Sequence, residues 1–154
     1  MSFVLEKDPN LIPQVLSNIL DSTTNGITLA DPDLEDMPIV YANKAFEMMT
    51  GYGQAEIIGR NCRFLQGSDR DQDARFQLRK AIDERLSVEV DIRNYKKSGE
   101  MFYNHLVLTP LFDDKKQLLY YLGVQYDITV QVKAAQEIVR LKQRLADLGA
   151  TPSD

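Results

Sequence analysis

Apolar residues near the start of the chain recur every three or four positions, the spacing of one face of an α-helix. The stretch follows Asp8 and Pro9, which form a typical N-cap and first-turn pair. Its apolar positions are Leu11, Ile12, Val15, Leu16, Ile19 and Leu20. We therefore predict an amphipathic N-terminal cap helix within residues 1–22.

Five later segments are rich in β-branched and aromatic residues and are bounded by polar turns, as expected of strands. They are residues 26–30, 38–41, 88–95, 101–112 and 117–127. Between the second and third segments, helical pieces are predicted at residues 44–49, 55–57, 61–65 and 71–84. This order predicts an α+β fold, with a five-stranded antiparallel sheet and helices on one face.

After residue 129 the pattern changes to a second flanking helix. Its strongest apolar positions are Ile138, Leu141, Leu145 and Leu148, spaced 3, 4 and 3 as in a coiled-coil seam. A helix of this length is marginal alone in water, so it needs a partner surface, either the sheet or a second copy of the chain. Gly149 and Pro152 are expected to end it.

Composition limits the function classes. The chain has 154 residues, 44% of them hydrophobic, which suits one domain with one core. The net charge of −5 argues against a nucleic-acid footprint. The single cysteine allows no internal disulfide, and no apolar run approaches the ~20 residues of a membrane span. We expect a cytoplasmic protein with no nucleic-acid or membrane partner.

The segment at residues 61–67 carries the candidate chemistry, because it places the only cysteine between an amide and a guanidinium. If this segment is one helical turn, Cys62 and Gln66 lie at i and i+4 on one face. Arg63 then lies one step around, with a charge suited to a phosphate. The alternative is that Cys62 is a small buried apolar residue and Arg63 a solvated surface charge.

Other segments of the chain also match motifs of one known family, and they occur in the same order as in that family. They are residues 39–43, 49–52, 94–97, 102–104 and 123–129. Together with residues 61–67 they resemble the LOV domains, the flavin-binding blue-light sensors of the PAS superfamily. The resemblance implies a PAS fold. It divides the chain into a cap helix at 1–22, a LOV core at 23–128 and a C-terminal helix and tail at 129–154.

The resemblance also implies a cofactor, flavin mononucleotide (FMN), and a role for particular residues. It implies that the Cys62 sulfur bonds reversibly to flavin carbon C4a in light, and that Gln125 reaches flavin N5. Asn94 and Asn104 are expected to bind the pyrimidine edge, because side-chain amides supply both donors and acceptors. Asn61 and Gln66 are expected to contact the ribityl chain.

Four arginines are candidates for the phosphate. Arg63 and Arg79 occupy the positions that LOV domains use for it, and Arg70 and Arg75 are additional candidates that would strengthen a charge-assisted clamp. For Arg70 and Arg75, surface pairing with the neighbouring aspartates is an open alternative. The loop at 67–74 is short, and in the family a longer insert accommodates an adenine dinucleotide, so the mononucleotide is preferred.

The function implied is that of a short bacterial LOV photoreceptor. It would not be an enzyme, and would act as a homodimer through its two flanking helices on an unknown downstream partner. A light-independent flavin redox protein and a PAS interaction module without flavin are the alternatives. Two further expectations are an ion pair between Glu56 and Lys97, and a structural role for His105 on the sheet face away from the pocket.

Overall fold

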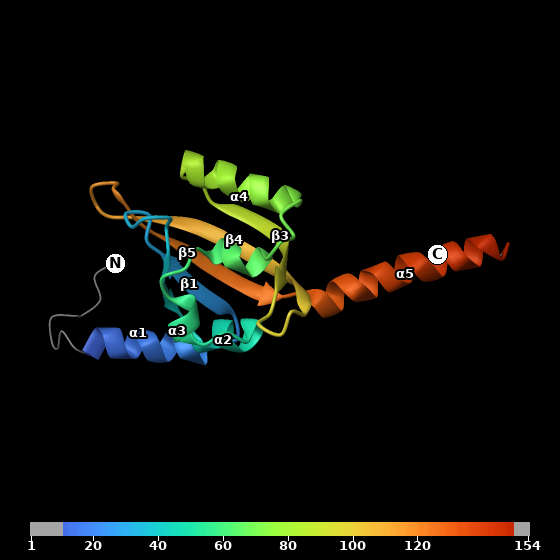
Figure 1. Cartoon of the computed structure of the whole chain (residues 1–154), viewed down its shortest axis with the longest axis horizontal. Helices are drawn as coiled ribbons and strands as arrows, with labels where there is room; N and C mark the ends of the chain where they lie inside the picture. The colour runs from blue at the N-terminus through green and yellow to red at the C-terminus, as the bar shows by residue number, and fades with distance from the viewer. Residues whose placement is uncertain (1–10, 150–154) are drawn as a thin grey trace.

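The computed structural model of the chain describes residues 11–149, and in it five antiparallel strands form one sheet (Figure 1). The strands are β1 (Gly26–Ala30), β2 (Ile39–Ala42), β3 (Val88–Tyr95), β4 (Met101–Phe112) and β5 (Leu118–Asp127). Their spatial order is β2-β1-β5-β4-β3, so the first and last strands in sequence meet at the centre. The predicted α+β architecture with a five-stranded antiparallel sheet is confirmed.

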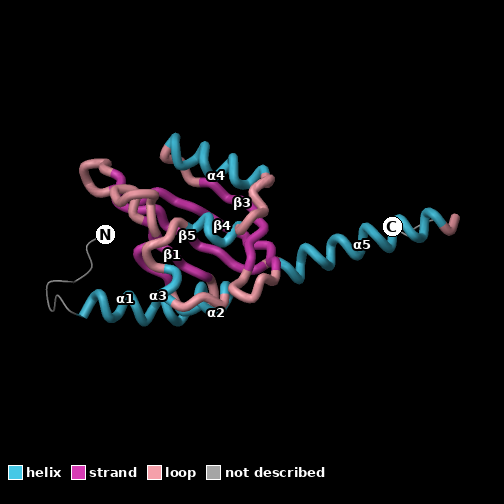
Figure 2. Tube along the Cα trace, viewed as in Figure 1, coloured by secondary structure: helices cyan, strands magenta, loops and turns pink. Residues whose placement is uncertain are grey.

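The helices lie mainly against one face of this sheet, as Figure 2 shows in cyan. They are α1 (Leu11–Ser22), α2 (Lys44–Thr50), α3 (Gln54–Ile57), the 3-10 helix η1 (Cys62–Gln66), α4 (Asp73–Glu84) and α5 (Thr129–Asp147). Helices α2, α3, η1 and α4 form the layer over the sheet, whereas α5 extends away from it (Figure 1). None of the helices in the described part of the chain is long and apolar enough to cross a membrane.

Several predicted boundaries were wrong by one or two residues. Strand β2 runs over 39–42 instead of 38–41, and β5 begins at Leu118. Helix α4 begins at Asp73 and not at residue 71, because the backbone of Gln72 is extended, with φ −141° and ψ 129°. The predicted start of the first helix at Asp8 and Pro9, and the predicted stop at Pro152, lie outside the described residues.

Asn43 joins three elements at the edge of the core. Its side-chain oxygen caps α2 by accepting from the backbone N–H of Phe46 at 3.1 Å, and it also accepts from that of Ile27 at 2.8 Å. Its amide nitrogen donates to the carbonyl of Leu20 at 2.8 Å, at the end of α1. Asn43 is fully buried, so these bonds fix the position of α1 and α2 against β1.

The hydrophobic core has two parts, with a cavity between the helices and the sheet. One part packs α2, α3 and η1 onto β2 through Ile39, Ala42, Phe46, Ile57 and Leu65. The other packs α4 onto the sheet through Ala30, Ala74, Val90, Ile92, Leu106, Leu108 and Tyr121. Phe46 from the first part and Leu106 and Leu108 from the second border the same cavity. The interior therefore holds a space that side chains do not fill.

The flanking helix α5 has no buried residue. Its predicted stripe is exposed, with Ile138 at 55%, Leu141 at 45% and Leu145 at 43%. Only the start of the helix is tied to the sheet: the backbone N–H of Tyr103 donates to the Thr129 hydroxyl at 2.9 Å, and that of Ile128 donates to the Tyr103 carbonyl at 2.8 Å. Of the two partner surfaces that the sequence left open, α5 does not use the sheet.

Candidate functional site

A cavity of about 580 Å³ lies between the sheet and the layer of α2, η1 and α4. Sheet residues Thr28, Leu106 and Gln125 form one wall, and Cys62 and Leu78 come from the helices opposite. Every predicted site residue lines this cavity except Asn94 and Asn104. Residues as far apart in the sequence as Thr28 and Gln125, 97 positions, therefore meet at one site.

Helix η1 carries Cys62 to the cavity. Asn61 caps it: its side-chain oxygen accepts from the backbone N–H of Arg63 at 3.0 Å, while its amide donates to the carbonyl of Asp36 at 2.7 Å. The turn is a 3-10 helix, so residues four apart are rotated by about 120° and the predicted shared α-helical face is wrong. Cys62 and Gln66 nevertheless line the same cavity.

The Cys62 side chain opens onto the cavity as a free thiol. Although the side chain is exposed to the cavity, desolvation by the surrounding protein atoms raises the pKa of this thiol, and the nearby Arg63 guanidinium opposes the shift. The group is therefore a protonated thiol at neutral pH and not a thiolate. A thiol in that state can supply both a sulfur atom and a proton.

Three buried amides form a polar cluster across β3, β4 and β5. The Asn104 amide nitrogen donates to the side-chain oxygen of Asn94 at 3.0 Å and to that of Gln125 at 2.8 Å. All three side chains are buried. The Asn104 oxygen has no partner among the described residues, nor does the buried oxygen of Gln66. Because unpaired buried polar atoms are costly, this arrangement fits a ligand with its own donors.

Two residues that the sequence analysis missed complete the surroundings of Gln125. The Gln125 amide donates to the hydroxyl of Thr28 at 3.3 Å, which comes from β1. Gly123 leaves the necessary space, because a Cβ there would lie 2.6 Å from the Thr28 hydroxyl and 3.3 Å from the Gln125 amide. A glycine inside a strand is a sequence signal of such a close approach and could have pointed to Gly123.

The four predicted phosphate residues all reach the cavity, and a fifth arginine, Arg85, joins them. Arg63 also forms an ion pair with Asp36 in the loop between β1 and β2. Within residues 14–149, no ion pair joins Arg70 or Arg75 to a carboxylate, so the alternative of pairing with neighbouring aspartates is not observed. The Arg75 Nε atom is buried and has no hydrogen-bond partner among residues 14–149, as expected of a group that binds an anion.

The two remaining expectations concern residues outside the cavity. His105 lies on the opposite sheet face, with Nδ1 2.6 Å from an Asp91 oxygen and Nε2 2.6 Å from a Glu89 oxygen. Asp91 first, and then Glu89, raise the pKa of His105 against the effect of burial. The Lys97 ammonium lies 2.6 Å from a Glu56 oxygen, so the predicted ion pair is present.

Several known proteins are similar to this chain. The PAS domain family matches residues 24–130. The LOV domain of a blue-light-activated histidine kinase from Erythrobacter litoralis is 45% identical, with a TM-score of 0.64 over 68% of this chain and 96% of its own. An RNA-binding light-oxygen-voltage receptor matches 93% of this chain and 40% of its own, at 36% identity and a TM-score of 0.80. The expectation of no nucleic-acid partner therefore stays a prediction.

Curated relatives carry photoreceptor names. A blue-light photoreceptor of Listeria monocytogenes is 38% identical over 76% of this chain and 46% of its own length. Blue-light-activated histidine kinase 2 of Erythrobacter litoralis is 42% identical over 79% of this chain and 35% of its own length. The chain thus spans less than half of either relative. The matched regions and the residues around Cys62 place the chain in one family: it belongs to the LOV domains of the PAS superfamily.

Proposed function

We propose that this chain is a blue-light photoreceptor domain that binds FMN in the cavity and responds through Cys62. The observation that carries the proposal is the meeting of the Cys62 thiol with the buried amides of Gln66 and Gln125 at one cavity, where Asn104 bonds to Gln125. The unpartnered oxygens of Gln66 and Asn104 support a polar ligand there. The chain belongs to the LOV domains, a family of flavin-binding blue-light sensors. We therefore infer that the ligand is a flavin.

The chain offers a partner for each part of FMN. Asn94, Asn104 and Gln125 would bind the ring, since amides match a pyrimidine edge that alternates donors and acceptors. Asn61 and Gln66 would hold the ribityl chain. The phosphate would be held by the arginines that line the cavity, namely Arg63, Arg70, Arg75 and Arg79. Their positive charge at one cavity supports the mononucleotide over uncharged riboflavin.

Cys62 would be the residue that reacts with the flavin in light. Bound flavin would supply a blue-absorbing ring whose C4a accepts the thiol sulfur while N5 takes the thiol proton, so that no oxidant or reductant is consumed. The thiol keeps its proton on sulfur at neutral pH, and desolvation by the surrounding protein atoms, which raises the pKa of Cys62, favours the same state. In the dark the Cys62 sulfur would leave the flavin carbon and regain its proton from the flavin, which would restore the free thiol.

Gln125 connects the site to the output helix. Its amide N–H can donate to an unprotonated ring nitrogen, and a protonated nitrogen requires its carbonyl instead. The carbonyl now accepts from Asn104 at 2.8 Å, so rotation of the amide breaks that bond. Asn104 follows Tyr103, whose backbone holds the junction to α5 through Ile128 and Thr129. One lost hydrogen bond, about 1 kcal/mol, shifts an equilibrium at that junction about fivefold.

The direct test of this function is optical. Purified protein should be yellow, lose its blue absorption under blue light and regain it in the dark, and the molecule released by heating should be FMN. A colourless protein would favour a PAS interaction module without flavin. A yellow protein that does not bleach reversibly would favour a flavin redox protein and contradict photoreception.

The organisation of the chain supports an output through its ends. The PAS match covers 24–130, so we propose a sensory core at 23–128 flanked by output segments at 1–22 and 129–154. The core would act on a downstream protein partner and would catalyse no reaction of its own. A single cysteine suits a cytoplasmic site of action.

We propose a homodimer that uses both flanking helices, because each has an exposed apolar stripe. Val15, Leu16 and Ile19 of α1 are exposed, as are Leu141 and Leu145 of α5. Exposed stripes of this kind mark interfaces. Truncation after Thr129 should therefore weaken dimerisation and leave the photochemistry intact, as measured by sedimentation at roughly tens of micromolar, the weak end of specific association.

A matched pair of variants separates the stripe from the helix itself. Leu141→Ala with Leu145→Ala should weaken the dimer as truncation does. Gln136→Ala with Gln143→Ala changes exposed polar positions of the same helix and should leave the dimer unchanged. A monomeric full-length protein in light and in dark would refute this interface.

A further inference from the structure

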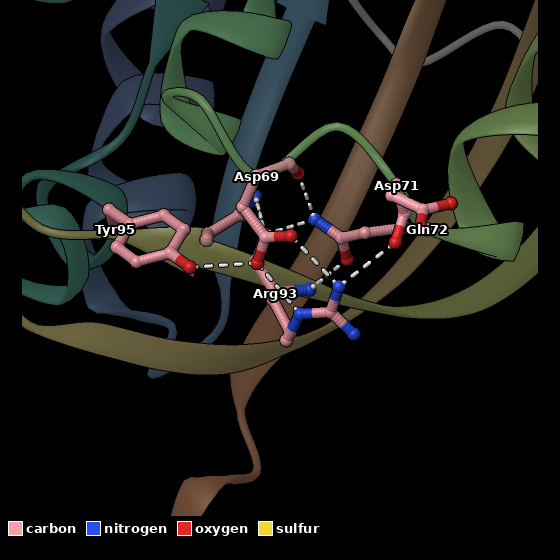
Figure 3. Close-up of polar contacts among 6 residues, drawn as sticks. Asp69, Asp71, Gln72, Arg93 and Tyr95 are labelled. Carbon is pink, nitrogen blue, oxygen red and sulfur yellow. Dashed lines mark hydrogen bonds and ion pairs between the residues drawn. The ribbon is translucent and has the colours of Figure 1, made fainter.

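The loop at 67–72, between η1 and α4, is tied to strand β3 by four side chains that we call the latch: Asp69, Gln72, Arg93 and Tyr95 (Figure 3). Arg93 donates through Nε at 2.7 Å and through Nη2 at 2.9 Å to the two carboxylate oxygens of Asp69. The Tyr95 hydroxyl donates to the same carboxylate at 2.7 Å. Asp69 therefore accepts three bonds from one strand.

Gln72 forms the second half of the latch. Its buried side-chain amide accepts from the backbone N–H of Arg93 at 2.8 Å and donates to the Arg93 carbonyl at 3.1 Å. It also donates to the Asp69 carbonyl at 2.7 Å. Strand β3 is at the edge of the sheet, so the amide of Gln72 occupies backbone groups that no further strand pairs. The loop is thereby bonded to β3 through both side chain and backbone.

The latch alternates in sequence with residues of the proposed flavin site. Arg70 lies between Asp69 and Gln72 and lines the cavity. Asn94 lies between Arg93 and Tyr95, is buried and bonds to Asn104. Latch residues themselves do not reach the flavin cavity. Each half of the latch thus adjoins in sequence one residue of the proposed flavin site: Arg70 of the phosphate arginines, or Asn94 of the ring-binding amides.

The chemistry of the latch makes it persistent. A bidentate pair between a guanidinium and a carboxylate is among the strongest and most directional polar contacts in proteins. Hydrogen bonds from Arg93 and Tyr95 lower the pKa of Asp69 to about 2, so the carboxylate stays charged throughout the physiological range. The ion pair of Asp69 with Arg93 therefore keeps both of its charges at neutral pH.

We propose that the latch is the lock on flavin entry and release: Asp69, Gln72, Arg93 and Tyr95 hold the 67–72 loop, whose Arg70 lines the cavity, against β3, and flavin passes only when they separate. This inference rests on the proposed flavin site. A lock that must open for passage in both directions slows association and dissociation alike, whereas a residue that contacts the ligand mainly sets dissociation. The latch residues are accordingly positioning residues.

The test is the pair of variants Arg93→Gln and Asp69→Asn, with FMN association and release each followed by flavin fluorescence in the purified full chain. Both rates should rise by at least about tenfold, corresponding to about 1.4 kcal/mol in each barrier. Tyr95→Phe removes a single bond and should raise both rates less. If the first two variants fold poorly, Tyr95→Phe still tests the lock.

Lys97→Gln is the matched control, because it removes a cation just beyond the end of the same strand and breaks the ion pair with Glu56. Both rates should match those of the parent protein. The double variant Asp69→Arg with Arg93→Asp swaps the two charged partners, so the ion pair can form again in the opposite direction. It should restore slow rates in part. Unchanged rates in Arg93→Gln and Asp69→Asn, or faster release with unchanged association, would overturn the lock.

A second readout is independent of flavin. In protein prepared without flavin, backbone hydrogen exchange at residues 67–72 should be faster in Arg93→Gln than in Lys97→Gln, because the loop opens more often. Equal exchange would overturn the inference. A parent protein that takes up no flavin would refute the proposed function instead, and the exchange experiment would still decide whether the latch holds the loop.

Discussion

Replacement of Cys62 by alanine should abolish reversible bleaching in blue light while FMN remains bound. The thiol supplies the sulfur and the proton of the proposed reaction, and no other cysteine in the chain can substitute for it. Affinity comes from other groups that line or adjoin the cavity, the amides around Gln125 and the arginines. We expect a persistently fluorescent yellow protein, measured by absorption before and after a blue pulse.

Two comparisons sharpen this prediction. Cys62→Ser keeps the size of the side chain but replaces the sulfur nucleophile by a weakly reactive hydroxyl, so it should behave as the alanine variant does. Arg60→Ala changes an exposed residue that precedes the segment, and should bleach and recover as the parent does. Bleaching that survives in Cys62→Ala would show that another group reacts.

Replacement of Gln125 by leucine should uncouple the photochemistry from the output helix. Leucine removes both the donor and the acceptor, and it leaves the Asn104 amide without its bond at 2.8 Å. Bleaching should persist, the flavin absorption should move to shorter wavelength, and the light-induced change at the start of α5 should shrink. Hydrogen exchange at residues 127–132, compared between light and dark, measures that change.

Gln117→Leu is the matched control, because it makes the same change from glutamine to leucine at another position. Gln117 is exposed in the turn before β5, far along the strand from the amide cluster. It should keep the full difference between light and dark. A Gln125→Leu protein that also kept the full difference would exclude this residue as the link between the cavity and α5.

The elements of the fold could be predicted from sequence because each depends on local periodicity. Alternation of apolar residues placed the five strands within one residue of their observed ends, and the spacing of 3 and 4 placed α5. The site could be predicted in outline because residues 61–67 and their companion segments form a family pattern. The family pattern nominated Cys62, Gln125 and the arginines as candidates, and the structure brings them to one cavity.

Tertiary structure alone decided which side chains face one another. The sequence left Arg70 and Arg75 free to pair with neighbouring aspartates, but Asp69 instead bonds to Arg93, twenty-four positions later. Thr28 lies beside Gln125 through the register of β1 with β5, which no local pattern reports.

The turn at Cys62 is 3-10 and not α-helical, and Asn61 caps it while bonding to Asp36. Periodicity is a property of neighbours along the chain, and it specifies which face of an element is buried. A hydrogen bond between distant segments depends on distance and angle, and these exist only after the sheet and its helices have packed.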